Sequence, residues 1–156
     1  MTVSRSSLKR ILALASALTV FTAAGLHAQS ADEAAIRRVI AQHYLEGRRL
    51  ADATVLGDAF VLGSAHMFFV QNDTLTDVPI PAYVRRIASA RNDPSWKAGG
   101  PSTARVTLVD ISGKAAVAKI EDQTSDAIIV DYMILLKVRG HWKVVSKAFD
   151  RVPAAR

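Results

Sequence analysis

One carboxylate stands inside an apolar stretch near the end of the chain, and it is the side chain best placed to do chemistry. Asp131 belongs to the run 130–138, which the dipeptide Arg139-Gly140 separates from a second run, 141–149. Both runs are rich in branched and aromatic residues, and Gly140 supplies the positive φ that a tight turn needs. The pattern predicts a β-hairpin that carries Asp131 on its first strand.

The hairpin register predicts what surrounds this carboxylate. A two-residue turn sets Val138 opposite His141, and because side chains alternate along a strand, Asp131 shares one face with a mostly apolar set. The other members are Met133, Leu135, Lys137, Trp142, Val144, Ser146 and Ala148. The small residues Ser146 and Ala148 leave room for a ligand, and an apolar wall favours a protonated carboxyl that can donate a hydrogen bond.

An N-terminal helix must position the second candidate, Tyr44. The segment Ser30-Ala31-Asp32-Glu33 has the spacing of a capping box, which marks the start of a helix. Apolar residues then recur at helical spacing, and Tyr44 falls on their side of the helix. The sequence predicts a helix from about Ala31 to Arg49 with Tyr44 on its inner face.

The remaining segments predict an α+β fold, in which helices and a hairpin precede a strand meander. The expected elements are a short helix capped by Asp52 that leads to Phe60, strands Ala65–Gln71 and Thr74–Val78 around an Asn72-Asp73 turn, a helix Ala82–Ala90 behind Pro81, a loop or flap Asn92–Pro101, and strands Ala104–Ile111 and Ala115–Gln123. No internal repeat or linker divides them, so we expect one domain.

The first residues predict export. Basic residues precede an apolar, Ala-rich run from Ile11 to Leu26, which is shorter than a membrane span, and the small residue Ala28 ends the segment. We expect residues 1–28 to be a cleaved signal peptide and residues 29–156 to form one domain in the periplasm or outside a bacterial cell. That domain is expected to lack a membrane association; a retained membrane anchor is the alternative.

Composition excludes several classes of function. The chain has a net charge of +6, and without the three basic residues of the signal, 17 basic side chains stand against 14 acidic ones. This modest excess is scattered along the chain, so nucleic acid is not expected as a partner. The absence of Cys excludes disulfides, thiol nucleophiles and Cys metal sites. Neither a metal nor another cofactor is expected, because no metal-ligand or phosphate-binding motif occurs.

Three segments resemble one known superfamily. They are His43-Tyr44-Leu45-Glu46-Gly47 leading into Asp52 and Phe60, Ser112 to Lys119, and Val130-Asp131-Tyr132 through Phe149. The pattern resembles the nuclear transport factor 2-like superfamily, and within it the family of putative lumazine-binding proteins. The resemblance implies a conical, curved antiparallel sheet packed on three helices around an apolar pocket, often paired as a homodimer through the sheet. The family usually has a His-Pro pair where Val61-Leu62 stands here.

The resemblance also implies a chemistry. Ketosteroid isomerases share the superfamily and use a Tyr and a protonated Asp as an oxyanion hole. Tyr44 and Asp131 lie in segments similar to those that supply this pair. The general base of these isomerases has no equivalent, because Phe69 stands near its position; His66 could substitute if the strand register differs. Without a base, proton abstraction next to a carbonyl loses its central step.

The sequence therefore favours a non-catalytic binding protein with a small apolar or aromatic ligand. The residues expected to line its pocket are Tyr44, Phe60, Phe69, Asp131, Met133, Ser146 and Ala148. One alternative is an isomerase or dehydratase, for which the catalytic candidates are Tyr44, Asp131 and His66. Another is a dimeric structural or interaction module without a ligand.

Each polar candidate also has a structural interpretation. Asp131 could form an ion pair across the sheet, with Lys147, Lys119 or Arg105. Tyr44 could be a core residue whose hydroxyl binds a backbone group. His66 could be a strand histidine with a hydrogen bond near the rim.

Overall fold

The computed structural model describes residues 28–124 and 127–153 of the chain. Residues 28–34 belong to a different unit from Ala35–Arg156, and they are helical. The predicted signal peptide lies outside the described residues except for Ala28, and it stays a prediction. Within the described ranges, no helix is both long enough and apolar enough to cross a membrane.

Helical structure begins earlier than the capping box predicts. Residues 28–38 are α-helical, so Ser30 lies inside the helix and is not its N-cap. Ala28 and Gln29 are themselves good helix formers, and the helix therefore includes them.

The helix changes its winding around Tyr44. Val39–Leu45 form a π-helix, η1, and α2 (Glu46–Arg49) follows it directly. Ile40 and Tyr44 are fully buried. π-Helical turns are rare and are frequently found at functional sites. Apolar periodicity predicts the ordinary helix of about 3.6 residues per turn and does not reveal this one.

Asp52 caps the next helix, α3 (Ala53–Gly57), as predicted. Its carboxylate accepts hydrogen bonds from two backbone N–H groups of the first turn. α2 and α3 approach each other closely at Gly47, where a Cβ would lie 2.5 Å from the backbone nitrogen of Leu56. Only a glycine permits this approach, so Gly47 sets how α3 packs against the end of the preceding helix.

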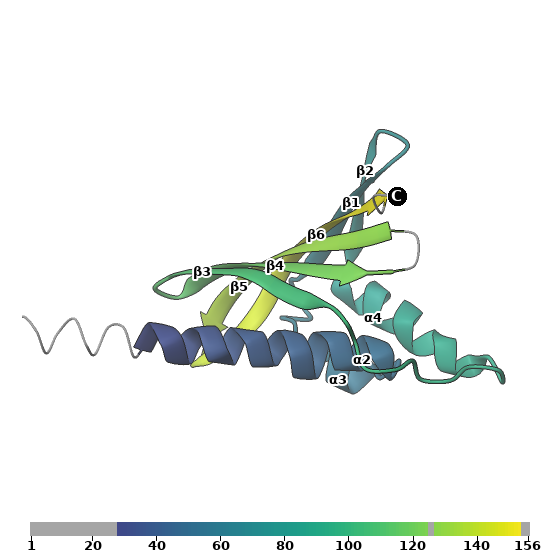
Figure 1. The fold of residues 1–156 in the computed structure, drawn as a ribbon, viewed down its shortest axis with the longest axis horizontal. Helices are drawn as coiled ribbons and strands as arrows, with labels where there is room; N and C mark the ends of the chain where they lie inside the picture. Colours follow the sequence, from purple (N-terminus) through teal and green to yellow (C-terminus); the bar gives the residue numbers. More distant parts are fainter. Residues whose placement is uncertain (1–27, 125–126, 154–156) are drawn as a thin grey trace, which may run out of the picture. The chain divides into compact units, whose positions relative to one another are not determined.

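Six strands form one curved sheet, and α2, α3 and α4 (Ile80–Ala88) lie on one side of it (Figure 1). The strands are β1 (His66–Gln71), β2 (Thr74–Pro79), β3 (Arg105–Ser112), β4 (Ala115–Gln123), β5 (Ala127–Val138) and β6 (His141–Pro153). Their order is β2-β1-β6-β5-β4-β3, and the neighbours are antiparallel except for β1 and β6, which are parallel. The predicted α+β fold is confirmed, and the elements differ from the predicted ones by small shifts at their ends.

A β-bulge interrupts the last hairpin. Val138 pairs with His141, as predicted, and both residues of the turn between them have positive φ. Further from the turn the register shifts, so that Asp131 pairs with Phe149 and not with Ala148. The predicted strand register is therefore correct only near the turn.

The bulge exchanges the two faces of β6. Val145 is the extra residue, and because side chains alternate along a strand, the positions after it change face. The prediction that Ser146 and Ala148 face a pocket is therefore wrong: Ala148 is exposed and Ser146 is half-buried. Lys147 takes the inner position and is only 4% exposed.

Candidate functional site

Two predicted site residues from distant parts of the chain meet in the core. The Tyr44 hydroxyl on η1 donates a hydrogen bond of 2.6 Å to Oδ2 of Asp131 on β5. Tyr44 is 0% and Asp131 2% exposed, and the ring of Phe60 packs edge-on against Tyr44 with 6.1 Å between centroids. Asp131 is thus a hydrogen-bond acceptor in this pair, whereas the sequence predicts a donor.

Lys147 completes the buried group. Its Nζ lies 2.9 Å from Asp131 Oδ1, at an angle outside that of a hydrogen bond, so the contact is chiefly an attraction of charges. The alternative of an ion pair with Lys147 is confirmed. Aromatic faces, which attract cations, and one thioether surround the ammonium. They are the rings of Phe149, Tyr44 and Tyr83, with centroids at 4.4, 5.5 and 5.7 Å, and Met67 Sδ at 3.9 Å.

Arg48 extends this polar group toward the surface. Its Nη1 donates to Tyr44 Oη across 3.4 Å and lies 3.9 Å from Oδ2 of Asp122 on β4. The guanidinium also lies over the Tyr44 ring, 5.3 Å from its centroid. The side chains of Arg48 and Asp122 are 28% and 23% exposed. Contacts therefore run from Lys147 and Asp131 in the core, through Tyr44, to Arg48 and Asp122 at a partly exposed edge.

Burial and neighbouring charges decide which of these groups are protonated. Burial raises the pKa of Tyr44 well above its ordinary value of 10.0, and repulsion from an ionised Tyr83 raises it further. Burial lowers the pKa of Lys147 from 10.5, against the attraction of Asp131. The interaction with Tyr44 raises the pKa of Arg48 above its already high value. Tyr44 is thus a neutral donor and Arg48 a permanent cation.

The other predicted pocket residues on the inner face belong to the packed core. Met133 is fully buried, and the ring of Phe69 lies 5.0 Å from that of Phe149. The space beside Asp131, where the sequence predicts a ligand, is taken by the Lys147 side chain.

His66 is not brought to this group. It alternates on β1 with the buried Met67, so it faces the opposite side of the sheet. Its Nδ1 lies 2.6 Å from Oδ1 of Asp77, and its side chain is 39% exposed. His66 therefore cannot act as the base for a molecule bound at Tyr44 and Asp131, and its structural interpretation is confirmed.

A cavity opens beside Arg48. Its volume is about 340 Å³, at the lower end of the ~300–1,000 Å³ that is typical of small-molecule sites. It is formed by the end of the N-terminal helix, α4, β4 and the segment before β3. The lining residues are Leu45, Arg48, Arg49, Ile87, Pro101, Ser102, Thr103 and Asp122.

Two arginines fasten the loop that leads to this cavity. Arg49 donates from Nη1 to the carbonyl oxygen of Gly99 across 3.0 Å. Arg91 donates from Nε to the carbonyl oxygen of Leu50 across 2.8 Å. The segment 92–101, predicted as a loop or flap, is therefore tied to the end of the helix, and the residues that follow it form a wall of the cavity.

Arg48 is the main site residue that sequence reasoning missed. It lies one helical turn after Tyr44, and side chains four residues apart share a helix face. That spacing is a signal that could have identified it. Lys147 had no comparable signal as an inner residue, because its position depends on the bulge at Val145.

The solved structures that this chain resembles include nuclear transport factor 2-like (NTF2-like) proteins. An NTF2-like protein of unknown function from Shewanella baltica is 33% identical to this chain, with a TM-score of 0.67 over 80% of this chain and 97% of that one. A similar protein from Methylobacillus flagellatus is 26% identical, with a TM-score of 0.62 over 77% and 91%. One from Silicibacter pomeroyi, 20% identical with a TM-score of 0.68 over 79% and 98%, shows the fold alone.

The family is narrower than the fold class. Residues 31–150 match the family described as "Putative lumazine-binding", and the chain belongs to that family. Among curated proteins, none matches the chain.

The ion pair predicts how substitutions change stability. Lys147→Met should lower the free energy of unfolding by about 3–5 kcal/mol, because it leaves the Asp131 carboxylate buried without a cation. Adding Asp131→Asn should restore part of this loss, since the amide oxygen can still accept from Tyr44 and no charge stays buried. Chemical denaturation of the single and double variants measures both effects.

Lys114→Met is the matched control, because Lys114 is exposed in the turn between β3 and β4. Its stability should stay within about 0.5 kcal/mol of the wild type. A Lys147→Met protein as stable as the wild type, or a double variant less stable than Lys147→Met alone, would contradict the role of the ion pair.

Proposed function

We propose that the protein binds a small organic molecule with an apolar or aromatic body in the cavity beside Arg48, without converting it. The cavity carries this proposal: Leu45, Ile87 and Pro101 supply apolar surface, and the other five lining residues are polar or charged. In a small-molecule site, apolar surface contacts the body of the ligand and polar groups fix its orientation. The family description makes lumazine, a planar heterocycle, the first compound to test.

Binding without turnover is supported by the contacts of the acid–base candidates. Asp131 is engaged by Tyr44 and Lys147, and His66 lies on the other face of the sheet. Among the described residues that line the cavity, Asp122 is the only carboxylate, and none is a histidine. A general base must reach the proton that it abstracts, so these positions favour binding over proton transfer.

Filling the cavity should abolish ligand binding. We expect thermal unfolding of the purified protein with lumazine, flavin-related heterocycles, phenols, steroids and aromatic carboxylic acids to identify a ligand. At about a hundredfold excess over Kd it should stabilise the fold by about 3 kcal/mol. Ser102→Trp, at an exposed residue of the cavity wall, should remove this shift, and Ser64→Trp, at an exposed residue outside the cavity, should keep it.

A shift that survives Ser102→Trp would contradict the location of the site. A panel in which no compound shifts the unfolding temperature would favour a structural or interaction module instead.

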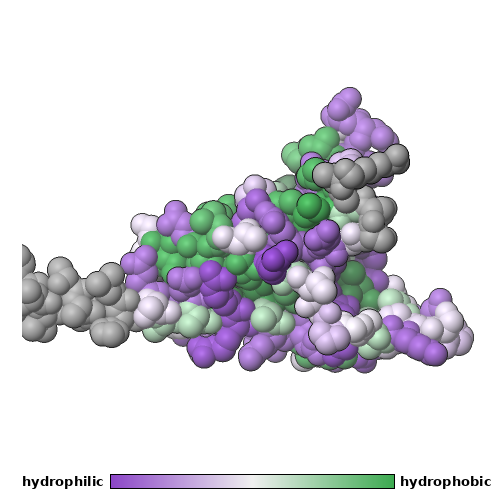
Figure 2. Space-filling model, in the orientation of Figure 1, coloured by the Kyte–Doolittle hydropathy of each residue, from purple (hydrophilic) through white to green (hydrophobic). Residues whose placement is uncertain are grey.

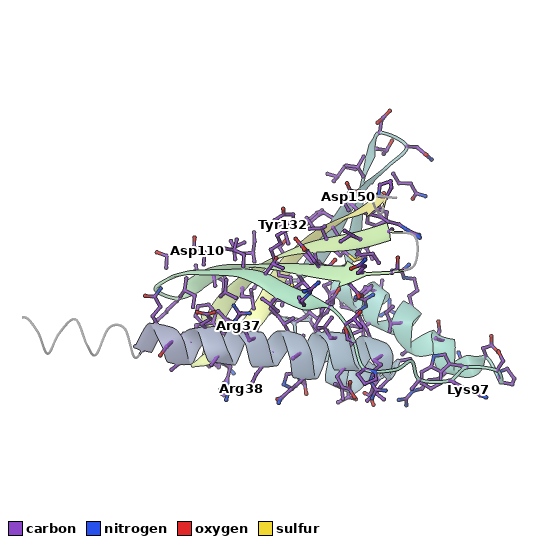
Figure 3. All side chains as sticks on the ribbon, in the orientation of Figure 1. Arg37, Arg38, Lys97, Asp110, Tyr132 and Asp150 are labelled. Atoms are coloured by element: carbon purple, nitrogen blue, oxygen red, sulfur yellow. The ribbon has the colours of Figure 1, made fainter. Side chains whose placement is uncertain are left out.

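We also propose that two copies of the chain pair through the outer face of the sheet. Large apolar side chains are exposed there on β4 and β5. They are Val117, Tyr132, Ile134, Leu136 and Val138. Val117 and Ile134 are paired neighbours, Figure 2 shows hydrophobic surface over β3 to β5, and Figure 3 shows Tyr132 pointing away from the helices. Contiguous exposed apolar surface is characteristic of protein interfaces, and the resemblance to NTF2-like proteins implies the same pairing.

A charged residue introduced into this face should dissociate the dimer into monomers. Ile134→Glu should give a monomer in analytical ultracentrifugation, because the interface would bury a carboxylate without a partner. Leu62→Glu, at an apolar residue between α3 and β1 that is 45% exposed, should leave the dimer intact. A wild-type protein that sediments as a monomer at micromolar concentration would contradict the proposal.

Export is a further part of the proposed function, supported by the basic and apolar pattern of the first residues. Protein recovered from the periplasm or the medium should begin at Gln29 in N-terminal sequencing. An uncleaved chain found only in the cytoplasm would contradict export.

A further inference from the structure

Arg48 leaves most of its donors without a protein partner, and these donors indicate the polar group of the ligand. A guanidinium presents a planar set of N–H donors. Among residues 28–124 and 127–153, only Nη1 of Arg48 has partners, namely Tyr44 Oη at 3.4 Å and Asp122 Oδ2 at 3.9 Å. The edge formed by Nε and Nη2 has none in this part of the chain. Among the described residues, Asp131 Oδ1 is the only buried side-chain polar atom without a hydrogen-bond partner, so this edge of Arg48 is open to solvent and can be reached by a ligand in the cavity.

The neighbouring arginine shows what this edge can hold. Arg49 lines the same cavity, and its Nε and Nη2 bind the two carboxylate oxygens of Glu46 across 2.7 and 2.5 Å. This is the side-on, two-bond geometry in which arginine recognises carboxylates. The same edge of Arg48 has no carboxylate of the described chain to bind.

The surrounding charges leave Arg48 able to attract an anion. Lys147 and Asp131 compensate each other in the core. Asp122 lies near Nη1 at 3.9 Å, beyond hydrogen-bond distance, and so it does not occupy the other edge. Arg48 is also more weakly hydrated than a lysine would be, which suits a partly buried cation that recognises an anion.

We infer that the ligand is a small carboxylic acid whose carboxylate binds side-on to Nε and Nη2 of Arg48. The inference rests on the proposed binding of a small molecule in this cavity and adds the chemical class of that molecule. Its apolar body contacts Leu45, Ile87 and Pro101, which line the same space. The hydroxyl of Ser102, on the same wall, is available to the carboxylate as a further donor.

The test compares naphthoate with naphthamide, which share an aromatic body and differ in the charge of the polar group. NMR titration of the purified protein, followed at the backbone amides of Ser102 and Thr103, gives the Kd of each compound. We expect naphthoate to bind about tenfold more tightly, because a charged two-bond contact is stronger than a neutral one. Arg48→Gln should remove this preference. Arg38→Gln should keep it, since Arg38 is exposed and points away from the sheet (Figure 3).

Asp122→Asn is an independent variant that leaves Arg48 in place. Loss of the carboxylate near Nη1 should increase the preference for naphthoate over naphthamide, because Asp122 attracts the same cation. Equal affinities of the two compounds for the wild type, or a preference that survives Arg48→Gln, would overturn the carboxylate assignment and leave the cavity as a binding site. If neither compound shifts Ser102 and Thr103, the inference is overturned together with the proposed location of binding.

Discussion

Burial of the Asp131–Lys147 ion pair is the constraint on which the interior of this fold depends. Two charges taken out of water are tolerated only where other groups satisfy them. Here the Tyr44 hydroxyl donates to one carboxylate oxygen, and aromatic rings surround the ammonium. The bulge at Val145 brings Lys147 to the inner face. In an unbroken register Lys147 would face outward, and Asp131 would lie beside small residues.

Because of this ion pair, Asp131 is not the polar group that a ligand in the proposed site would contact. The carboxylate that the sequence suggests as an anchor already holds a cation of the protein. The hydrogen bond from Arg48 to Tyr44 continues the polar group outward, and Arg48 reaches the cavity wall. The proposed site therefore has a guanidinium in place of an acid, which would favour ligands with acceptor oxygens. The shared NTF2-like fold thus carries a polar site unlike the one that the isomerase resemblance implies.

Most of the fold could be predicted from the sequence, because its signals are local. The Asp52 cap depends on one side chain and the next turn, and the burial of Asp131 and Met133 follows from alternation along one strand. The bulge at Val145 could not be predicted, since no Gly or Pro marks it and it depends on pairing between strands. The π-helix around Tyr44 likewise has no local signal. The sequence therefore could not show which residues of β6 face the core after the bulge, and it did not place Lys147 beside Asp131.

A crystal structure of the protein with bound naphthoate tests most directly whether ligands bind outside an intact ion pair. We expect the carboxylate to lie against Nε and Nη2 of Arg48, with Lys147 Nζ still 2.9 Å from Asp131 Oδ1 as in the free protein. Naphthoate bound beside Asp131, with Lys147 displaced from its aromatic rings, would contradict this. That result would show that the ligand binds in the interior and that the Lys147 side chain moves when it binds.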